Sequence, residues 1–186
     1  MSSDHTENSL SGAVLLGIDL QPVFIKAMAD GARVLRRCEF AAVVATGLGL
    51  PVVFTEQVPG KLGGTAPALL SAAPRARVFG KTAFSALGDE TIRAALLDAE
   101  HLLIAGLETS VCVYQTALDA LAAGVSVTVL SDCVAARRAD DAAVCLAALI
   151  RAGAHVLPSE TVFYALLRDV SHSYFRTFTQ CVKTYA

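Results

Sequence analysis

Runs of apolar residues recur along this chain, and most of them are continuous rather than alternating. A continuous apolar run is typical of a parallel strand that is buried on both faces of a sheet. The pattern predicts six strands, at residues 13–19, 51–55, 77–79, 101–105, 125–130 and 154–157. These strands are expected to lie side by side in the centre of the molecule.

The segments between the strands have the spacing of apolar residues that is typical of helices. They predict helices at residues 33–48, 90–99, 110–123 and 140–152, and a last helical region that begins near Ser159. This alternation predicts an α/β protein of three layers (α/β/α). It is a Rossmann-like architecture, with helices on both faces of a six-stranded, mostly parallel sheet. Residues 12–186 are predicted to form one domain, and the polar residues 1–11 to form a mobile tail.

The composition adds an expectation about assembly. Hydrophobic residues make up 54% of the chain and charged residues only 17%. This balance is more apolar than that of an average globular protein, and it predicts apolar surface beyond a single core. We therefore expect a homo-oligomer, either a dimer or a tetramer.

Several partners and locations are disfavoured. The formal net charge is −2 and no Lys/Arg run stands out, so we expect no nucleic-acid partner. No apolar run reaches the roughly 18 residues of a membrane helix, so we expect no membrane contact. Five cysteines without CxxC pairing indicate reduced thiols and a cytoplasmic protein.

Three reactive residues come at or after the ends of predicted strands. Asp19 ends the first run, Lys81 follows the third, and Cys112 lies between the fourth strand and the next helix. Each has an ordinary explanation: a turn residue, a surface lysine and a small buried thiol. Cys112 can also be interpreted as an activated thiol, because N–H groups at a helix N-terminus stabilise a thiolate and lower a thiol pKa.

The three residues are more informative as a group than one by one. The carboxyl ends of parallel strands meet at one edge of a sheet, so all three are expected on the same edge. An acid can take the proton of a thiol, a lysine can hold that acid ionised, and the thiolate can attack an electrophilic carbon. The combination predicts nucleophilic catalysis.

With these residues the chain resembles the isochorismatase-like cysteine hydrolases. The matching motifs are Ile18-Asp19-Leu20-Gln21, Gly80-Lys81-Thr82-Ala83-Phe84-Ser85 and Gly106-Leu107-Glu108-Thr109-Ser110-Val111-Cys112-Val113. Their order and separation match the family over nearly all of residues 13–183. Within the family the chain looks most like the isochorismatase-domain-containing proteins, on the segments 55–59, 62–65 and 115–119.

The resemblance implies a role for each matching residue. Cys112 is implied as the nucleophile. Asp19 is implied as the general base that takes its proton and later serves as an acid toward the leaving group, and Lys81 as the residue that orients Asp19. Backbone N–H groups of Glu108 and Cys112 are implied as the oxyanion hole. Family members commonly have a cis peptide in this loop, which here is the bond between Leu107 and Glu108.

The chain also departs from the family pattern. Nicotinamidases of this family build a metal site on an Asp-x-His pair, whereas the corresponding positions here are Gln57 and Pro59. Neither supplies an imidazole ligand, so we expect no metal and no other cofactor. Position 110 is Ser where the closest subgroup usually has His, which affects selectivity. The side chains expected to line the substrate pocket are Gln21, Phe24, Gln57 and Ser110.

These features predict a hydrolase of a small amide or carbamoyl substrate that reacts through a covalent thioester at Cys112. Ether cleavage of the isochorismatase type typically occurs in members that lack this cysteine. The alternative is a catalytically weak binding or scaffolding member of the same fold, motivated by the unusual Ser110.

The pair Arg137-Arg138 is expected on the surface or at a substrate carboxylate. A nuclease is not expected, because the chain has no acidic metal cluster and no basic stripe.

Overall fold

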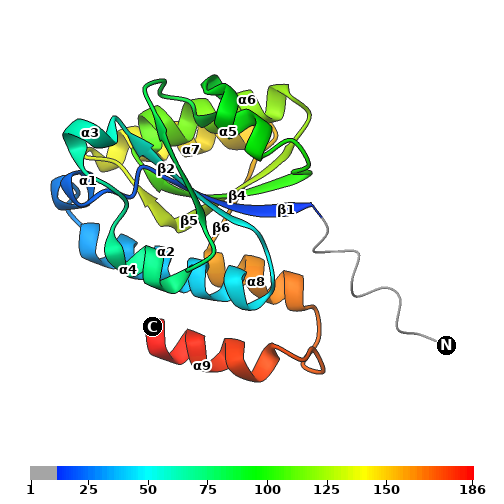
Figure 1. Ribbon diagram of the computed structural model, residues 1–186. Helices are drawn as coiled ribbons and strands as arrows, with labels where there is room; N and C mark the ends of the chain where they lie inside the picture. Colours follow the sequence, from blue (N-terminus) through cyan, green and yellow to red (C-terminus); the bar gives the residue numbers. More distant parts are fainter. Residues whose placement is uncertain (1–11) are drawn as a thin grey trace.

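A six-stranded sheet forms the centre of the computed structural model, which describes residues 12–186 (Figure 1). The tail predicted for residues 1–11 lies outside the described residues. Every strand pair is parallel, and the order is β3-β2-β1-β4-β5-β6. The strands are β1 (Ala13–Ile18), β2 (Val52–Gln57), β3 (Arg77–Lys81), β4 (His101–Leu107), β5 (Ser126–Ala135) and β6 (His155–Leu157). The order reverses between β1 and β4, the place where open α/β sheets bind ligands.

Helices cover both faces of the sheet (Figure 1). On one face lie α2 (Gly31–Gly47) and α8 (Ser159–Leu167), and on the other α5 (Glu90–Ala95), α6 (Tyr114–Ala122) and α7 (Ala139–Arg151). The last helix, α9 (Phe175–Tyr185), packs outside α2, where the rings of Phe40 and Phe178 are 6.0 Å apart. A separate apolar core fills the space on each side of the sheet. The predicted three-layer α/β/α fold is confirmed.

Short helices add to the predicted elements. Helix α1 (Pro22–Ala27) follows β1, and the long connection after β2 holds α3 (Pro59–Leu62) and α4 (Pro67–Ala72). Each begins with a proline, whose fixed φ suits the first turn of a helix. Helices of four to six residues are too short to show an apolar periodicity, so the pattern did not predict them.

A close contact between β1 and β4 positions the functional edge of the sheet. Gly106 pairs with Ile18 and has a φ of +135°. A Cβ at this position would lie 2.2 Å from the carbonyl oxygen of Ile18, so only glycine fits. The contact brings together the two segments that follow these strands, Asp19 on one side and the turn after Leu107 on the other.

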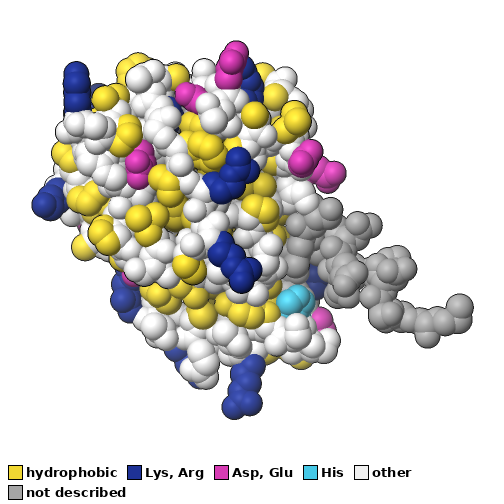
Figure 2. All heavy atoms as spheres, in the orientation of Figure 1, with side chains coloured by type: hydrophobic (Ala, Val, Ile, Leu, Met, Phe, Trp, Pro, Cys, Tyr) yellow, Lys and Arg dark blue, Asp and Glu magenta, His cyan; other side chains and the backbone are white. Residues whose placement is uncertain are grey.

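The surface of the molecule carries few charges. On the face shown in Figure 2, small groups of hydrophobic side chains lie between white areas of backbone and uncharged side chains, with scattered Lys, Arg, Asp and Glu side chains. Within residues 12–186, no helix combines the length and the apolar character that crossing a bilayer requires.

Candidate active site

The structure brings Asp19, Lys81 and Cys112 to the carboxyl edge of the sheet. Asp19 is the first residue after β1, and Lys81 is the last residue of β3. Cys112 lies in a π-helical turn, Thr109–Val113, which connects β4 to α6. The φ of Asp19 is +52°, in the left-handed region that Asp tolerates better than most residues. The predicted gathering of the three residues at one sheet edge is therefore present.

Asp19 and Lys81 form a buried ion pair. Lys81 Nζ lies 2.7 Å from Asp19 Oδ2, and the two side chains are 0% and 1% exposed. The Thr55 hydroxyl donates a hydrogen bond to the other carboxylate oxygen, Oδ1, at 2.9 Å. Both oxygens of Asp19 are thus engaged by donors. Buried ions need such partners, because breaking a buried pair leaves an uncompensated charge.

The surroundings of Cys112 raise the pKa of its thiol to about 12. Burial is the largest cause, the negative charge of Asp19 adds to the rise, and the positive charge of Lys81 opposes it. The lowered pKa expected from the helix N-terminus is therefore wrong, because the sequence pattern includes neither burial nor the nearby carboxylate. At neutral pH the sulfur carries its proton, and a base has to remove it as the sulfur reacts.

Three of the side chains expected to line the substrate pocket, those of Gln21, Gln57 and Phe24, are packed against other residues of the protein. Gln21 and Gln57 are 0% and 9% exposed, and the backbone N–H of Gln57 donates to Gln21 Oε1 at 2.7 Å. Phe24 lies on α1, half-buried against the apolar core next to α2. Substrate contacts of these three side chains stay predictions.

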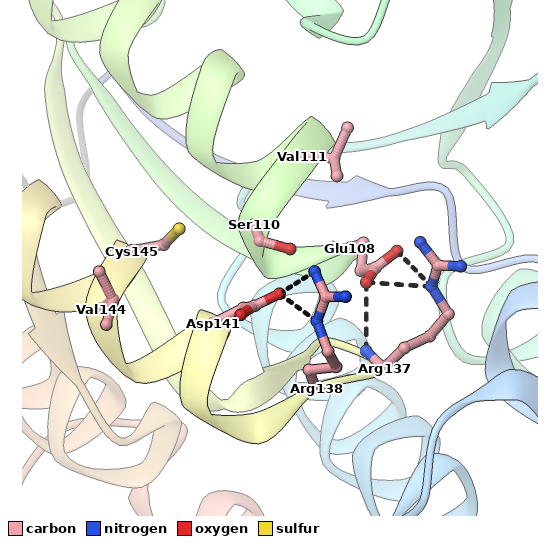
Figure 3. A pocket seen from close by; sticks show the side chains of 8 residues that line it. All are labelled: Glu108, Ser110, Val111, Arg137, Arg138, Asp141, Val144 and Cys145. Carbon is pink, nitrogen blue, oxygen red and sulfur yellow. Dashed lines mark hydrogen bonds and ion pairs between the residues drawn. The ribbon is translucent and has the colours of Figure 1, made fainter.

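A cavity of about 510 Å³ adjoins the nucleophile turn (Figure 3). Its walls come from the turn and from the start of α7: Glu108, Ser110, Val111, Arg137, Arg138, Asp141, Val144 and Cys145. The Glu108 carboxylate accepts from Arg137 Nε at 3.1 and 3.2 Å and from the Arg137 backbone N–H at 3.2 Å. Arg138 pairs with Asp141 at 2.6 Å. Ser110 lies between these two ion pairs and Cys145 (Figure 3).

Some residues of this region were not singled out in the sequence. Thr55 belongs to the matching segment 55–59 but was given no role, although its place near the end of β2 was a signal that it could reach the same sheet edge. Asp141 lies at the start of the helix predicted at residues 140–152 and follows Arg138 by three residues, a spacing at which opposite charges can pair once the helix begins earlier. The Glu108–Arg137 contact joins segments that are 29 positions apart, and no local sequence pattern predicts it.

Comparison with known proteins decides the family. The family model of the isochorismatase domain matches residues 13–161. The chain belongs to the isochorismatase family. Isochorismatase domain-containing protein 2A of Mus musculus is 34% identical over 174 residues, which cover 92% of this chain and 82% of the mouse protein. Isochorismatase family protein 1B of Dictyostelium discoideum is 30% identical over 171 residues, covering 89% and 83%.

Solved structures of isochorismatase-like proteins share the fold. MAR1 ribonuclease from Caenorhabditis elegans superimposes with a TM-score of 0.89 at 27% identity, over 94% of this chain and 91% of that chain. The YcaC protein of Escherichia coli, an octameric hydrolase of unknown specificity, superimposes with a TM-score of 0.82 at 21% identity over the whole of both chains.

Two details of the isochorismatase resemblance can be followed in the structure. The peptide bond between Leu107 and Glu108 is cis, as expected. Gln57, which stands at the position of a nicotinamidase metal ligand, accepts a hydrogen bond from Lys81 at 2.5 Å. Within residues 12–186, no group of three or more His, Cys, Asp or Glu is arranged so that it could hold a metal ion.

Proposed function

We propose that this protein is a cysteine hydrolase that cleaves the C–N bond of a small amide- or carbamoyl-type substrate. Cys112 is the nucleophile, Asp19 the general base and acid, and Lys81 the residue that orients Asp19. The observation that carries the proposal is the buried Asp19–Lys81 pair beside the Cys112 thiol. A buried ion pair contributes little net stability, so its place beside a thiol at a sheet edge favours a chemical role.

In the first half-reaction Asp19 takes the thiol proton while the sulfur attacks the carbonyl carbon. The carbonyl oxygen becomes an oxyanion, which the backbone N–H groups of Glu108 and Cys112 stabilise. The oxyanion then re-forms the C=O bond and breaks the C–N bond, and Asp19 gives its proton to the leaving nitrogen. The acyl group stays on Cys112 as a thioester.

In the second half-reaction a water molecule attacks the thioester carbon. Asp19 takes a proton from this water, and the Cys112 sulfur leaves and recovers the proton from Asp19. The raised pKa of the free thiol suits this scheme, because the proton moves to Asp19 only as the C–S bond forms. The products are a carboxylic or carbamic acid and an amine or ammonia.

Screening of small amides and carbamoyl compounds tests the proposal. Wild-type protein should release amine from at least one of them, and Cys112→Ala should lower that rate by about a thousandfold or more. Cys181→Ala is the matched control, because Cys181 is a half-buried cysteine on α9, outside the proposed site, and should keep full activity. Equal turnover by wild type and Cys112→Ala would reject Cys112 as the nucleophile.

Two other functions can be tested with the same proteins. RNA cleavage is favoured by one observation, the 27% identity to a structure described as MAR1 ribonuclease. Incubation of wild type and Cys112→Ala with RNA tests it: cleavage by either one supports this second function. A binding or scaffolding protein of low turnover would leave every amide and the RNA intact.

Self-association belongs to the proposal as well. The apolar composition predicts a homo-oligomer, and the fold neighbour YcaC of E. coli is described as octameric. At 21% identity this neighbour shares the fold alone, so the number of subunits in this protein is left to measurement.

A further inference from the structure

Gln57 connects the catalytic lysine to the rest of the sheet edge. Its Oε1 accepts a hydrogen bond from Lys81 Nζ at 2.5 Å, and its Nε2 donates to the carbonyl oxygen of Thr82 at 2.8 Å. The orientation of the amide follows from chemistry, since an ammonium and a carbonyl require an oxygen and an N–H group respectively. Gln57 therefore contacts Lys81 as an uncharged acceptor, whereas Asp19 contacts it as a charged one.

The three protons of Lys81 have no freedom to turn toward a substrate. Besides Asp19 and Gln57, Nζ has two backbone acceptors, the carbonyl oxygens of Phe84 at 3.1 Å and Ala83 at 3.2 Å. Three donors face four acceptors, so the ammonium is fixed in place. Within residues 12–186, Asp19 and Gln57 are the side chains whose oxygens accept hydrogen bonds from Nζ, and the Cys112 thiol also interacts with Lys81.

Gln21 holds Gln57 in turn. The backbone N–H of Gln57 donates to Gln21 Oε1 at 2.7 Å, and Gln21 Nε2 donates to the Gln57 carbonyl at 3.1 Å. The same Nε2 donates to the Gly63 carbonyl at 2.6 Å, which ties the end of β2 to the segment after α3. Both glutamines are buried, and their side-chain amides have their partners within the protein.

We infer that Gln57 is a positioning residue that holds Lys81 against Asp19, with Gln21 fixing Gln57 at the end of β2. In this role the two glutamines act through Lys81, and the substrate contact expected for them from the sequence stays a separate prediction. It rests on the proposed function in one respect, since it assigns Gln57 to the same Asp19–Lys81–Cys112 site. It does not depend on which substrate the protein hydrolyses.

The rate at which iodoacetamide alkylates Cys112 reports on this site without any substrate. Gln57→Glu places a carboxylate where the amide oxygen meets Lys81, which makes the surroundings of the thiol more negative and its ionisation harder. We expect this variant to be alkylated about fivefold more slowly than wild type at about pH 8, as judged by mass spectrometry of the Cys112 peptide. Gln57→Met has nearly the same size but no acceptor for Lys81, so the ammonium is held less firmly near the thiol, and we expect alkylation to be slowed by about threefold.

A matched control separates this effect from a general one. Gln180→Glu makes the same chemical change at an exposed position of α9 and should alkylate like wild type. The proposal is overturned if Gln57→Glu alkylates like Gln180→Glu. It is also overturned if Gln57→Met alkylates like wild type, because Lys81 then keeps its place without the amide.

A double-mutant cycle tests whether Gln57 acts through Lys81. In the Lys81→Met background, Gln57→Met should have no further effect on the alkylation rate, whereas an unchanged threefold effect contradicts the proposal. If Lys81→Met does not fold, the comparison of Gln57→Met with wild type still decides. Failure of the hydrolase proposal is separate: it appears as an absence of Cys112-dependent turnover, whatever the alkylation rates are.

Discussion

At the scale of single residues, the site is a thiol surrounded by two opposite charges that act on it in opposite directions. The Asp19 carboxylate makes ionisation of Cys112 harder and the Lys81 ammonium makes it easier, and burial outweighs both. A cysteine whose pKa is raised in this way is not a thiolate at neutral pH before it reacts. In the proposed mechanism its proton passes to Asp19, and the ion pair with Lys81 keeps that carboxylate in place.

Asp19→Asn separates thiol reactivity from catalysis. The substitution removes a negative charge that raises the pKa of the Cys112 thiol, so the pKa should fall from about 12 and iodoacetamide should react faster at any pH below that value. Hydrolysis of an amide should be lost, because the base is gone. Lys81→Met should act in the opposite direction and slow alkylation. The measurement is the pH dependence of Cys112 alkylation by peptide mass spectrometry.

Two other cysteines serve as internal references for this prediction. Cys145 and Cys181 are half-buried and distant from the Asp19–Lys81 pair in sequence, so their alkylation should not respond to either substitution. If Asp19→Asn slows Cys112 or changes all three cysteines alike, the charges assigned to the site do not control the thiol.

The residues of the site differ in how far the sequence reveals them. Asp19, Lys81 and Cys112 could be found because each comes at the end of a strand, and parallel strands end on a common edge. The direction of the thiol pKa could not be predicted, since burial and the distance to Asp19 are tertiary facts. The partners of Gln57 were hidden for the same reason: its amide joins Lys81 and Thr82, which are 24 and 25 positions away.

At the scale of elements, the end of β5 shows how one carboxylate joins several segments. Asp132 accepts from Arg37 Nε at 2.8 Å and from the backbone N–H and hydroxyl of Ser159, each at 2.7 Å. Arg37 lies on α2 and also donates to the carbonyl oxygen of Tyr185 at 3.2 Å. Asp132 therefore fastens α2, the start of α8 and, through Arg37, the end of α9 to the sheet.

Strand β5 is longer than its apolar pattern predicts. The run of apolar residues stops at Leu130, and Ser131 and Asp132 look like the start of a loop. The strand continues to Ala135 because Val134 and Ala135 pair with β4, and the polar Asp132 in this extension has partners on two helices that are far away in the sequence. Apolar periodicity predicts the buried part of a strand. It underestimates the length of a strand whose polar residues have partners far away in the sequence.

Asp132→Asn should destabilise the fold by about 2 kcal/mol at neutral pH, because an amide cannot keep the charged contact with Arg37 together with both Ser159 contacts. Although burial raises the pKa of Asp132, the Ser159 and Arg37 hydrogen bonds hold it below its ordinary value of 3.8. A carboxyl with a lowered pKa stabilises the fold above the unfolded pKa and loses this contribution as the pH falls through the folded value. The difference between wild type and variant should therefore shrink in acid.

Urea unfolding at neutral and acidic pH measures both effects. Asp30→Asn is the matched control: Asp30 also pairs with an arginine, at 3.4 Å, but both side chains are more than half exposed. Such surface pairs contribute little, so the control should shift the free energy of unfolding by less than about 0.5 kcal/mol. Equal destabilisation by the two substitutions would contradict the role given to Asp132.

At the scale of the whole molecule, α7 has an apolar face that the monomer leaves in water. Ala143, Ala147 and Ile150 follow the i, i+4, i+7 spacing of one helix face, and Val144 lies beside them; all four are exposed. Val144 and Ile150 are 67% and 55% exposed. The two alanines are small, which allows another helix to approach closely. The face begins beside the cavity that Val144 and Cys145 line next to the nucleophile turn.

We expect this face of α7 to form a contact between copies of the chain. Association removes the apolar side chains from water, which is the main driving force of such contacts. Val144→Glu introduces a charge whose burial at the contact is costly, so it should lower the molar mass measured by light scattering after size exclusion. Circular dichroism should remain that of wild type, because Val144 is outside the core.

A second exposed residue makes the prediction specific to α7. Leu97 is 82% exposed and lies after α5, outside the α7 face. Leu97→Glu has the same chemistry and should leave the molar mass unchanged. If Leu97→Glu dissociates the protein and Val144→Glu does not, the contact lies on the α5 side. If the wild type is a monomer at high concentration, the apolar surface does not drive association. The low content of charged residues, 17% of the chain, then needs another explanation.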